Sequence, residues 1–278
     1  MPIYHAPCKI NLSLKVLGKR PDGFHAIETL MAPLHLCDRL IFSPANQTQL
    51  ICCQAGVPVD ESNLVMQALR LIERELGHPV HWQIELSKNV PHGAGLGGGS
   101  SDAATTLLAL NDLEHVQLSK ERLLELAAEL GSDVGFFIDR GICRCSGRGE
   151  IVTALPEYQD FEGTVLLLKP AFGVSTPDAY GRWATSTPLP RVNYETHVWH
   201  GMEFVNDLER PVFEKFLFLA EIKMWLLRQQ GVHVAMMSGS GSTMFAFVDS
   251  VERGRELAKD AKRELDPTLW SWVGACGA

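Results

Sequence analysis

Hydrophobic and polar residues alternate strictly in two stretches of the N-terminal half of the chain. In residues 8–16 every second position is apolar, while Lys9 and Asn11 fall on the opposite face, roughly 7 Å apart along an extended chain. Residues 80–86 alternate in the same way. This period of two predicts β-strands, and a strand that alternates in this way usually has one face toward water.

A helical period governs three other stretches. Residues 62–72 form an amphipathic pattern that Ser62 or Asn63 would cap. Residues 119–130 begin at a second capping serine and stop before a glycine, and residues 252–265 show an amphipathic pattern near the C-terminus. We therefore expect three amphipathic helices.

The other predicted elements are shorter or less regular. The hydrophobic pattern changes at residues 165–168, where a continuous apolar run predicts a buried strand. We place the start of a second lobe near residue 153. We further expect one or two strands over 27–42, two strands over 141–155, a loop over 173–180, an irregular loop over 183–200, a helical stretch over 206–227, a hairpin with strands over 232–237 and 243–248, and a strand over 270–273.

The composition narrows the possible function classes. A length of 278 residues allows one large domain or two closely packed ones, and an apolar fraction of 46% is enough for a sizeable core. A net charge of −8 argues against nonspecific binding to nucleic acid or to an anionic membrane, so an anionic substrate would need a locally positive site. The most apolar helical stretch, 216–227, carries Glu221 and Lys223 and is too short to span a bilayer.

The N-terminus and the cysteines indicate a cytoplasmic protein. Residues 1–5 lack the basic start and apolar run of a signal peptide. The chain has seven cysteines, an odd number, and neither Cys52-Cys53 nor Cys143 with Cys145 has the spacing of zinc ligands. We expect these cysteines to be reduced.

One stretch dominates the candidate chemistry. Residues 91–104 read PHGAGLGGGSSDAA, and within 93–99 only Ala94 and Leu96 are not glycine. Glycine permits positive φ and leaves no side chain to hold a ligand away, and a helix behind such a loop presents unpaired N–H groups to an anion. The pattern predicts a phosphate-binding loop. The alternative is a mobile glycine loop before an ordinary helix.

Three polar residues follow the glycines. Ser100 or Ser101 would cap the next helix or bind a phosphate-bound Mg²⁺. Asp102 suits the positive end of the helix dipole but would repel a triphosphate. It would therefore face away from the phosphates or help to hold Mg²⁺.

Better-known phosphate loops fit poorly. The Walker pattern G-x-x-x-x-G-K-[ST] is absent. Residues 93–98 match G-x-G-x-x-G, but the preceding strand alternates and two helices follow, where a dinucleotide fold requires a strand buried on both faces and then a second strand. The V-A-I-K and H-R-D patterns of protein kinases are also absent.

Five short motifs resemble those of the GHMP kinase superfamily, and they occur in that family's order over nearly the whole chain. The central motif, P-x-x-x-G-L-G-G-G-S-S-x-A-A, matches residues 91–104. The others are P-x-K-I-N-L at 7–12, D-G-[YF]-H at 22–25, G-[AS]-D-V-P-F-F at 131–137 and G-[ST]-G-x-x-x-F at 239–245. Several motifs in the right order are far more specific than any single one.

The resemblance implies that Lys9 and Asp133 are catalytic. Lys9 would lie against Asp133, keep it ionised and offset charge as the phosphoryl group moves, since an opposite charge within ~4–6 Å favours the ionised carboxylate. From the residues alone, Lys9 could also lie on the solvated face of an ordinary strand, and Asp133 could only form a turn. Gly135 stands where the family usually has proline, which makes the backbone beside Asp133 more flexible.

The resemblance also implies two sets of binding residues. The ATP-binding set comprises Asn63, Pro91, His92, Gly93, Ala94, Gly95, Leu96, Gly97, Gly98, Gly99, Ser100 and Ser101, with Ser101 as the metal ligand. The acceptor-binding set comprises Asn11, Phe24, His25, Tyr180, Gly239 and Gly241. In this scheme Phe24 and Tyr180 sandwich a cytosine ring. From the residues alone, Asn63 could also be only a helix cap. Phe24 and Tyr180 could cover the core or the surface, and Gly239 and Gly241 could lie in an ordinary hairpin turn.

The implied fold is a two-lobed α+β fold of the GHMP-kinase type, with mixed sheets and helices packed on one side. Residues 1–152 would form the N-terminal lobe, with the ATP loop and the catalytic residues, and residues 153–278 would complete the acceptor site. The implied reaction is ATP-dependent phosphorylation of the 2-hydroxyl of 4-diphosphocytidyl-2-C-methyl-D-erythritol, in the non-mevalonate route to isoprenoid precursors, with Mg²⁺ as cofactor.

Partners and alternatives follow from the same interpretation. We expect a small-molecule substrate, no nucleic acid or membrane partner, and a monomer or weak homodimer. Two alternatives are another small-molecule kinase of the GHMP type and a non-catalytic nucleotide-binding protein of the same fold. The cytosine-binding residues Phe24, His25 and Tyr180 discriminate against the first. The presence of both Lys9 and Asp133 argues against the second, which ATP binding without ADP production would favour.

Overall fold

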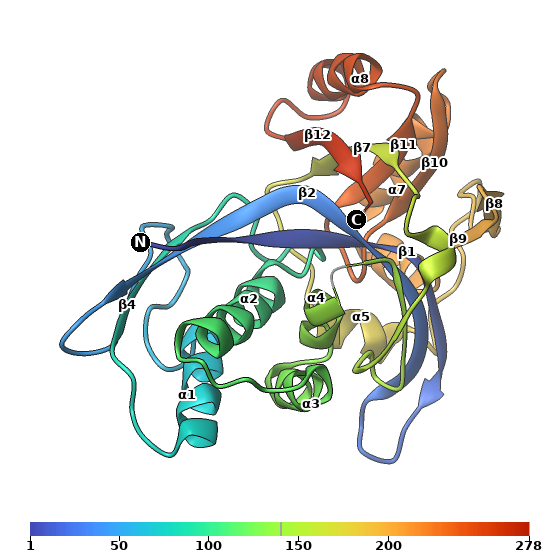
Figure 1. Cartoon of the computed structure of the whole chain (residues 1–278). Helices are drawn as coiled ribbons and strands as arrows, with labels where there is room; N and C mark the ends of the chain where they lie inside the picture. The colour runs from blue at the N-terminus through green and yellow to red at the C-terminus, as the bar shows by residue number, and fades with distance from the viewer. Residues whose placement is uncertain (140, 278) are drawn as a thin grey trace.

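The computed structural model describes residues 1–139 and 141–277, and within them twelve strands form one mixed sheet (Figure 1). The main path runs β10-β11-β7-β12-β2-β1-β9-β8, while β4 and β5 pair with β2, β3 pairs with β4, and β6 pairs with β5. The strands are β1 Ile3–Lys19, β2 His25–Pro44, β3 Gln49–Ile51, β4 Trp82–Ser87, β5 Cys143–Ser146, β6 Ile151–Ala154, β7 Gly163–Lys169, β8 His197–Trp199, β9 Met202–Asn206, β10 Val232–Met237, β11 Met244–Val248 and β12 Trp270–Cys276.

Strands β1 and β2 form a long antiparallel hairpin that runs through both halves of the molecule (Figure 1). The predicted turn closes it, with the Arg20 N–H donating to the Phe24 carbonyl at 2.7 Å. Alternation correctly predicted β1, but its polar face is not solvated, because Lys9 and Asn11 are each only 3% exposed. The glycine loop covers this face, and the Lys9 N–H donates to the Leu96 carbonyl at 3.0 Å.

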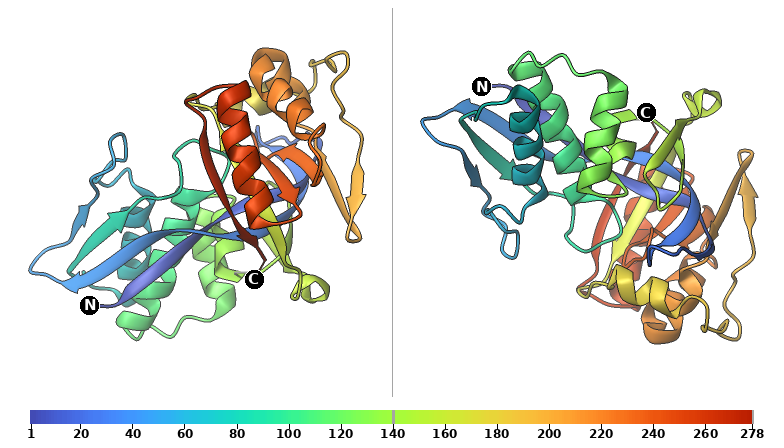
Figure 2. Two further views of the ribbon diagram at one scale, coloured as in Figure 1. Left: turned by 90° about the horizontal axis from the view of Figure 1, so that it is seen from above. Right: turned by 90° about the horizontal axis from the view of Figure 1, so that it is seen from below.

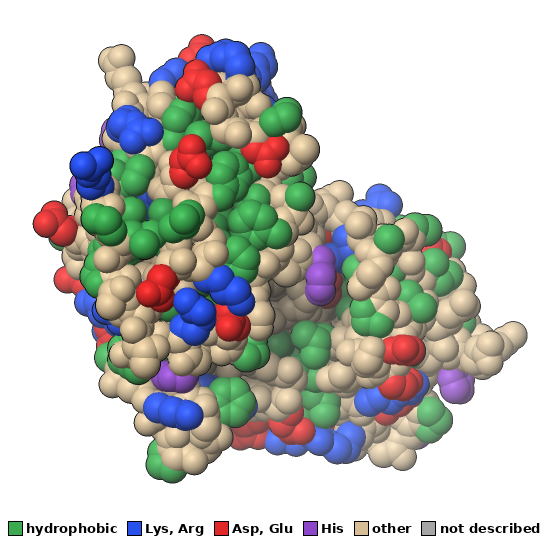
Figure 3. All heavy atoms as spheres, turned by 180° about the vertical axis from the view of Figure 1, so that it is seen from behind, with side chains coloured by type: hydrophobic (Ala, Val, Ile, Leu, Met, Phe, Trp, Pro, Cys, Tyr) green, Lys and Arg blue, Asp and Glu red, His purple; other side chains and the backbone are tan. Residues whose placement is uncertain are grey.

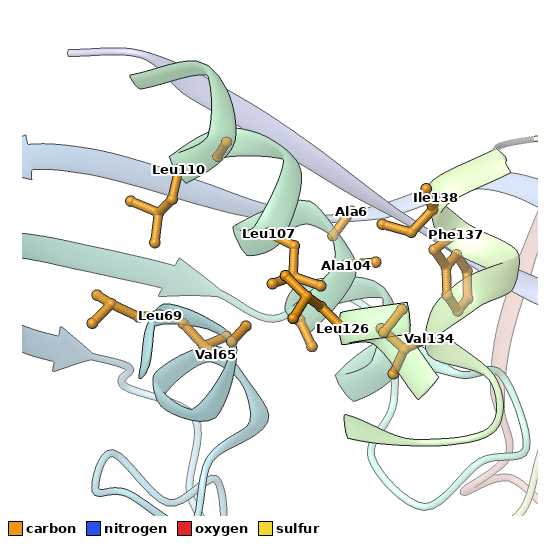
Figure 4. Packing of buried hydrophobic residues seen from close by; sticks show 14 of the residues in the cluster. Ala6, Val65, Leu69, Ala104, Leu107, Leu110, Leu126, Val134, Phe137 and Ile138 are labelled. Carbon is orange, nitrogen blue, oxygen red and sulfur yellow. The ribbon is translucent and has the colours of Figure 1, made fainter. Parts of the chain in front are cut away.

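Four helices pack on one side of the sheet in the N-terminal half (Figures 1 and 2): α1 Leu64–Leu76, α2 Gly98–Leu113, α3 Lys120–Leu130 and α4 Val134–Asp139. Helix α2 lies in the middle and contacts β1 and the other three helices. This position explains why α2 is buried nearly all round instead of along one stripe. The shared hydrophobic cluster in Figure 4 includes Ala6, Val65, Leu69, Ala104, Leu107, Leu110, Leu126, Val134, Phe137 and Ile138.

The helix caps follow the sequence in two cases and depart from it in a third. Asn63 caps α1 by accepting from the Val65 N–H at 2.9 Å, and Ser119 caps α3. The prediction that Ser100 or Ser101 caps α2 is wrong, because this helix begins at Gly98. Its N-cap is Gly97, whose φ of 69° is a left-handed conformation open to glycine. Both serines therefore lie inside the first turn.

In the C-terminal half, α7 Leu217–Leu226 and α8 Val251–Glu264 cover one face of β10, β11, β7 and β12 (Figure 2). Leu166 and Leu168 of β7 pack in the cluster that contains these helices. Val165 and Leu167 point to the other face and join residues of β1, β2 and the glycine loop in a third cluster. A sheet covered on both faces explains why β7 is a continuous apolar run.

Two predicted loops contain regular structure. The stretch predicted as loop 173–180 contains most of α5 Thr176–Arg182, which Ser175 caps. The stretch predicted as loop 183–200 ends in β8, which forms a hairpin with β9. Helix α6 Glu209–Lys215 precedes α7, and a short 3-10 turn, Pro156–Tyr158, precedes β7.

The predicted α+β class, with a mixed sheet and helices packed on it, is confirmed. The division into lobes at residue 153 remains a prediction, and that residue lies within β6. No helix in residues 1–139 and 141–277 combines the length and the apolar character needed to cross a membrane.

Candidate active site

A cleft of about 850 Å³ lies between the N-terminal and C-terminal halves of the chain. Its walls come from β1, the β1–β2 turn, the glycine loop, the start of α2, the residues before α4, the helix α5 and the β10–β11 turn. The surface is also hollowed between two masses of the molecule on the face drawn in Figure 3. Residues far apart in sequence therefore face one cavity.

The glycine loop forms one wall, and its conformation requires glycine. Gly93, Gly95 and Gly97 have φ of 62°, 75° and 69°. A Cβ on Gly95 would lie 2.2 Å from the Ser238 carbonyl oxygen, so a side chain at this position would collide with the β10–β11 turn. The loop is therefore held in close backbone contact with the C-terminal half.

Hydrogen bonds fix the same loop on two sides. The Thr243 N–H donates to the Ala94 carbonyl at 3.2 Å, and the Ser238 hydroxyl donates to the Gly95 carbonyl at 3.0 Å. With its carbonyls engaged in this way, the loop leads into α2, whose first residues, Gly98 to Ser100, line the cleft. The unpaired N–H groups and the positive dipole end of α2 make this wall suitable for phosphate.

Lys9 and Asp133 meet at the floor of the cleft. The Lys9 ammonium lies 3.4 Å from Asp133 Oδ2, and it also donates to Asn11 Oδ1 at 2.6 Å and to the Gly95 carbonyl at 3.1 Å. The Lys9 side chain is 4% exposed, whereas that of Asp133 is 36% exposed. The lysine is therefore fixed from three sides, while the carboxylate remains open to a ligand in the cleft.

The amide of Asn11 has a fixed orientation. Its Nδ2 donates to the Thr29 hydroxyl at 2.8 Å, and that hydroxyl donates to the Ser13 carbonyl at 2.5 Å. Gly239 lies against Asn11 and Lys9, because a Cβ built on it would be 3.2 Å from Asn11 Oδ1 and 3.5 Å from Lys9 Nζ. The β10–β11 turn therefore contacts both the glycine loop and the polar residues of β1.

The other end of the cleft carries aromatic rings. His25 stacks on Tyr180, with ring centroids 5.3 Å apart and an interplanar angle of 29°. Phe24 is 51% exposed, and the Arg148 guanidinium lies 5.1 Å from its ring centroid. Burial raises the pKa of Tyr180, so this side chain stays an uncharged ring and hydroxyl. Exposed and stacked rings beside a cation suit a planar, anionic ligand.

The cleft is locally positive in a chain of net charge −8. Four cationic side chains line it, against the carboxylates of Asp102 and Asp133: Lys9, Lys19, Lys88 and Arg148. Asp102 is paired with Lys88 at 2.6 Å, and Lys88 also pairs with the buried Asp38. Burial raises the pKa of Asp102 to about 7, against the attraction of Lys88. Asp102 lies beyond the first turn of α2, and its charge is offset by Lys88.

The structure brings together almost all the residues that the sequence indicated. Lys9, Asn11, Asn63, Asp133, the residues from Pro91 to Ser100, Phe24, His25, Tyr180 and Gly239 all line the cleft. Ser101 and Gly241 are not among the lining residues. Ser101 is fully buried and its hydroxyl has no hydrogen-bond partner, while Gly241 packs on Met237.

Sequence reasoning missed several residues of the cleft. Lys88 precedes Pro91 by three positions, and Arg148 lies in the predicted turn between two short strands. Thr176 sits in the S-T-P stretch before Tyr180, and its hydroxyl lies 2.8 Å from that of Ser240. Cations and hydroxyls beside matched motifs were the available signal, although nothing in the sequence placed them in one cavity.

Family profiles match two parts of the chain. The profile described as the GHMP kinases N terminal domain matches residues 63–141, and the profile described as GHMP kinases C terminal matches residues 200–266. The first match covers the glycine loop and Asp133, and the second covers the β10–β11 turn.

Curated relatives are similar over most of their length. The chain is 39% identical over 274 residues to the 4-diphosphocytidyl-2-C-methyl-D-erythritol kinase of Methylacidiphilum infernorum, covering 95% of this chain and 93% of the relative. It is 40% identical over 240 residues to the enzyme of that name from Protochlamydia amoebophila, covering 86% of this chain and 82% of the relative.

Solved structures give the same picture. A crystal structure of 4-(cytidine 5'-diphospho)-2C-methyl-D-erythritol kinase superposes with a TM-score of 0.79 at 33% identity, and each chain is covered completely. The mevalonate kinase of Methanococcus jannaschii superposes with a TM-score of 0.67 at 13% identity, covering 99% of this chain and 98% of that one. The second likeness concerns the fold alone.

Proposed function

This chain belongs to the GHMP kinase family, and from that membership we propose that it is an ATP-dependent kinase of 4-diphosphocytidyl-2-C-methyl-D-erythritol. The observation that carries the proposal is the Lys9–Asp133 pair beside a phosphate-binding loop, in a chain whose relatives with that activity are 39% and 40% identical. The acceptor is the 2-hydroxyl, and the reaction serves the non-mevalonate route to isoprenoid precursors.

The glycine loop and the start of α2 would hold the phosphates of ATP. Gly93, Gly95 and Gly97 adopt positive φ and line the cleft, a Cβ on Gly93 would meet no atom within 4 Å, and the dipole of α2 favours the negative charge. Asn63 lines the same cleft at the start of α1 and would lie near the nucleotide. Phosphoryl transfer depends mainly on positioning and electrostatics, which a rigid loop supplies.

Asp133 would orient the attacking hydroxyl and take its proton. As the bond between the γ-phosphorus and the bridging oxygen of ATP breaks, the acceptor oxygen bonds to phosphorus and its proton passes to the Asp133 carboxylate. The Lys9 ammonium, 3.4 Å away, would stabilise the carboxylate before transfer and offset charge as the phosphoryl group moves. Because the transition state is loose, orientation contributes more than early proton removal.

The aromatic end of the cleft would bind the cytidyl group. Phe24 offers an exposed ring face, and the stacked pair of His25 and Tyr180 offers a second surface with hydrogen-bonding groups. Asn11 and Gly239 would contact the acceptor near Lys9. Arg148 and Lys19 add positive charge for the diphosphate of this substrate.

Magnesium fits this site only as a partner of the nucleotide phosphates. In the described residues, no three His, Cys, Asp or Glu side chains gather as a metal site. Mg²⁺ keeps several waters and is usually held by one or two protein groups together with substrate phosphates. Ser101 lies behind the cleft wall with a buried hydroxyl that lacks a hydrogen-bond partner, and beside Ser100, which lines the cleft, it is the protein group that we assign to the ion. The ion would neutralise phosphate charge when bound.

The proposal is tested by measuring ADP release from Mg-ATP with 4-diphosphocytidyl-2-C-methyl-D-erythritol and, separately, with the same polyol without the cytidyl group. We expect turnover only with the cytidyl compound. Turnover with both would favour a kinase of broader specificity. ATP binding without turnover on either compound would contradict the proposed activity and favour a nucleotide-binding protein. A cytoplasmic location and a monomer or weak homodimer remain predictions.

A further inference from the structure

Asn206, the last residue of β9, forms hydrogen bonds to backbone groups with both ends of its side-chain amide. Its Nδ2 donates to the Met237 carbonyl and to the Gly239 carbonyl, both at 2.8 Å. Its Oδ1 accepts from the Leu208 N–H at 2.9 Å. The residue is 4% exposed and does not line the cleft. An amide saturated in this way has a single orientation, so it holds the β10–β11 turn in one place.

The same segment is fixed to the strand that carries Lys9 and Asn11. Asn206 pairs with Leu14 of β1, and the Asp207 N–H donates to the Leu14 carbonyl at 2.9 Å. The Asp207 carboxylate accepts from the Val16 N–H at 2.7 Å. Asn206 therefore reaches the β10–β11 turn from a support that is part of the β1 framework.

Side chains connect β9 to β10, because these two strands are not paired with each other by backbone hydrogen bonds. Strand β9 pairs with β1 and β8, whereas β10 pairs with β11 at the opposite end of the sheet path. The sheet curls so that β9 and β10 still come into contact. Asn206 bridges these two strands at the end near the cleft, and Glu209 assists by accepting from the Met237 N–H at 2.9 Å.

The position of the turn determines how the catalytic groups pack. Gly239 lies against Asn11 Oδ1 and Lys9 Nζ, with its built Cβ at 3.2 Å and 3.5 Å from these atoms. Ser238 donates to the Gly95 carbonyl, which also accepts from Lys9. A shift of the turn would therefore disturb Lys9 through Gly239, and the glycine loop through the hydrogen bonds from Ser238 and Thr243.

We propose that Asn206 is a positioning residue for phosphoryl transfer, which acts by holding the Gly239 carbonyl and thereby setting the turn against Lys9 and Asn11. The catalytic part of this inference rests on the proposed kinase activity. The structural part, that Asn206 fixes the turn, does not. Small displacements of a catalytic group cost up to ~100-fold in rate, so the effect should be large for a residue that touches no substrate.

The decisive variant is Asn206→Asp. It keeps the shape but replaces the donating NH₂ by an oxygen that faces two carbonyls. We expect kcat to fall about 10- to 100-fold while the dissociation constant of ATP changes much less, because Asn206 holds the Gly239 carbonyl and Gly239 lies against Asn11 and Lys9, whereas Ser238 and Thr243 attach the turn to the glycine loop through hydrogen bonds of their own. Hydrogen exchange of a peptide that spans the β10–β11 turn should accelerate, while exchange in α1 and α3 stays at the wild-type rate.

The matched control is Asn193→Asp. Asn193 is exposed and only accepts a hydrogen bond, from the Glu195 N–H at 2.8 Å, so a carboxylate can replace it. This control should leave both kcat and exchange unchanged.

Two results would overturn the inference. One is a folded Asn206→Asp variant with wild-type kcat and wild-type exchange at the turn. The other is an equal loss of kcat and ATP affinity with faster exchange throughout, which indicates a general structural role. If this variant does not fold, Asn206→Ala, which removes the donors without adding charge, is judged by the same criteria. A wild-type protein inactive on the cytidyl substrate rejects the proposed function, and the exchange measurement still decides whether Asn206 fixes the turn.

Discussion

The Lys9 ammonium and the Asp133 carboxylate lie 3.4 Å apart, but their environments differ. Lys9 is enclosed and donates hydrogen bonds to Asn11 and to the Gly95 carbonyl, whereas Asp133 faces the cleft with a third of its side chain exposed. The pair therefore combines a fixed positive charge with an accessible carboxylate, the arrangement on which the proposed role of Asp133 as a general base depends.

Replacing Asp133 by asparagine should remove the proton acceptor and keep the shape of the site. We expect kcat to fall by about 10²–10⁴-fold, the range typical of a lost general base, with little change in ATP affinity. Steady-state ADP release and equilibrium ATP binding measure the two quantities.

The control for this variant is Asp139→Asn in the short helix α4 that Asp133 precedes. Asp139 pairs with Lys120 at 2.8 Å and does not line the cleft, so kcat should stay near the wild-type value. If Asp133→Asn retained wild-type turnover, Asp133 would not be the base. The double variant with Lys9→Met should lose much less than the product of the single losses, because the two residues act as a unit.

Alanine substitutions at two glycines of one loop distinguish the cost of backbone strain from the cost of a steric collision. Gly93→Ala and Gly95→Ala both place a side chain at positive φ, at a cost of about 1–2 kcal/mol. A Cβ on Gly93 meets no atom within 4 Å, whereas on Gly95 it lies 2.2 Å from the Ser238 carbonyl oxygen. We expect Gly95→Ala to lose ~1–3 kcal/mol more of the unfolding free energy than Gly93→Ala.

Chemical denaturation of both variants measures this difference. Gly95→Ala should also raise KM for ATP more than Gly93→Ala, because the collision separates the loop from the β10–β11 turn. Equal losses of stability in the two variants would mean that the close approach of the loop to Ser238 does not contribute to stability.

The exposed ring of Phe24 should matter for the acceptor and not for ATP. Phe24→Ala removes a stacking surface, and stacking of one base is worth about 1–3 kcal/mol. We therefore expect KM for the cytidyl substrate to rise roughly 10-fold or more, with KM for ATP unchanged. Leu17→Ala is the control, since Leu17 lies in the same hairpin, is 66% exposed and does not line the cleft. Equal effects of both variants would argue against a base-binding role.

The cysteines should differ sharply in reactivity. All seven are free, and burial raises the pKa of Cys143 to about 12 and also raises the pKa of Cys8, Cys145 and Cys276. Since the thiolate is the nucleophile, a raised pKa leaves almost no reactive form at pH 8. Alkylation of the native protein at pH 8, followed by peptide mass spectrometry, should label the exposed Cys53 and spare Cys143. Rapid labelling of Cys143 in the native state would contradict the buried placement of β5.

Local structure was predictable wherever the pattern of side chains decided it. The alternation in β1 and the amphipathic period of α1 and α3 gave correct elements, because each has one face that packs on a core. Helix α5 was missed, although Ser175 and Pro177 are a typical start, because the helix is short and lies where a turn-rich sequence also permits a loop. The start of α2 was placed too late, because Gly97 caps it through backbone conformation instead of a side chain.

The sequence by itself determined the family, the order of the motifs and the residue types that we propose for phosphate binding and proton transfer. The phosphate-binding features depend on local chemistry: glycine for positive φ and a helix start for anions. Only the tertiary structure decided that Lys9 is buried and Asp133 open, that Lys88 offsets Asp102, and that Asn206 supports the Gly239 turn. Contacts between β9 and β10 depend on how the whole sheet curls, and no periodicity along the chain encodes that curvature.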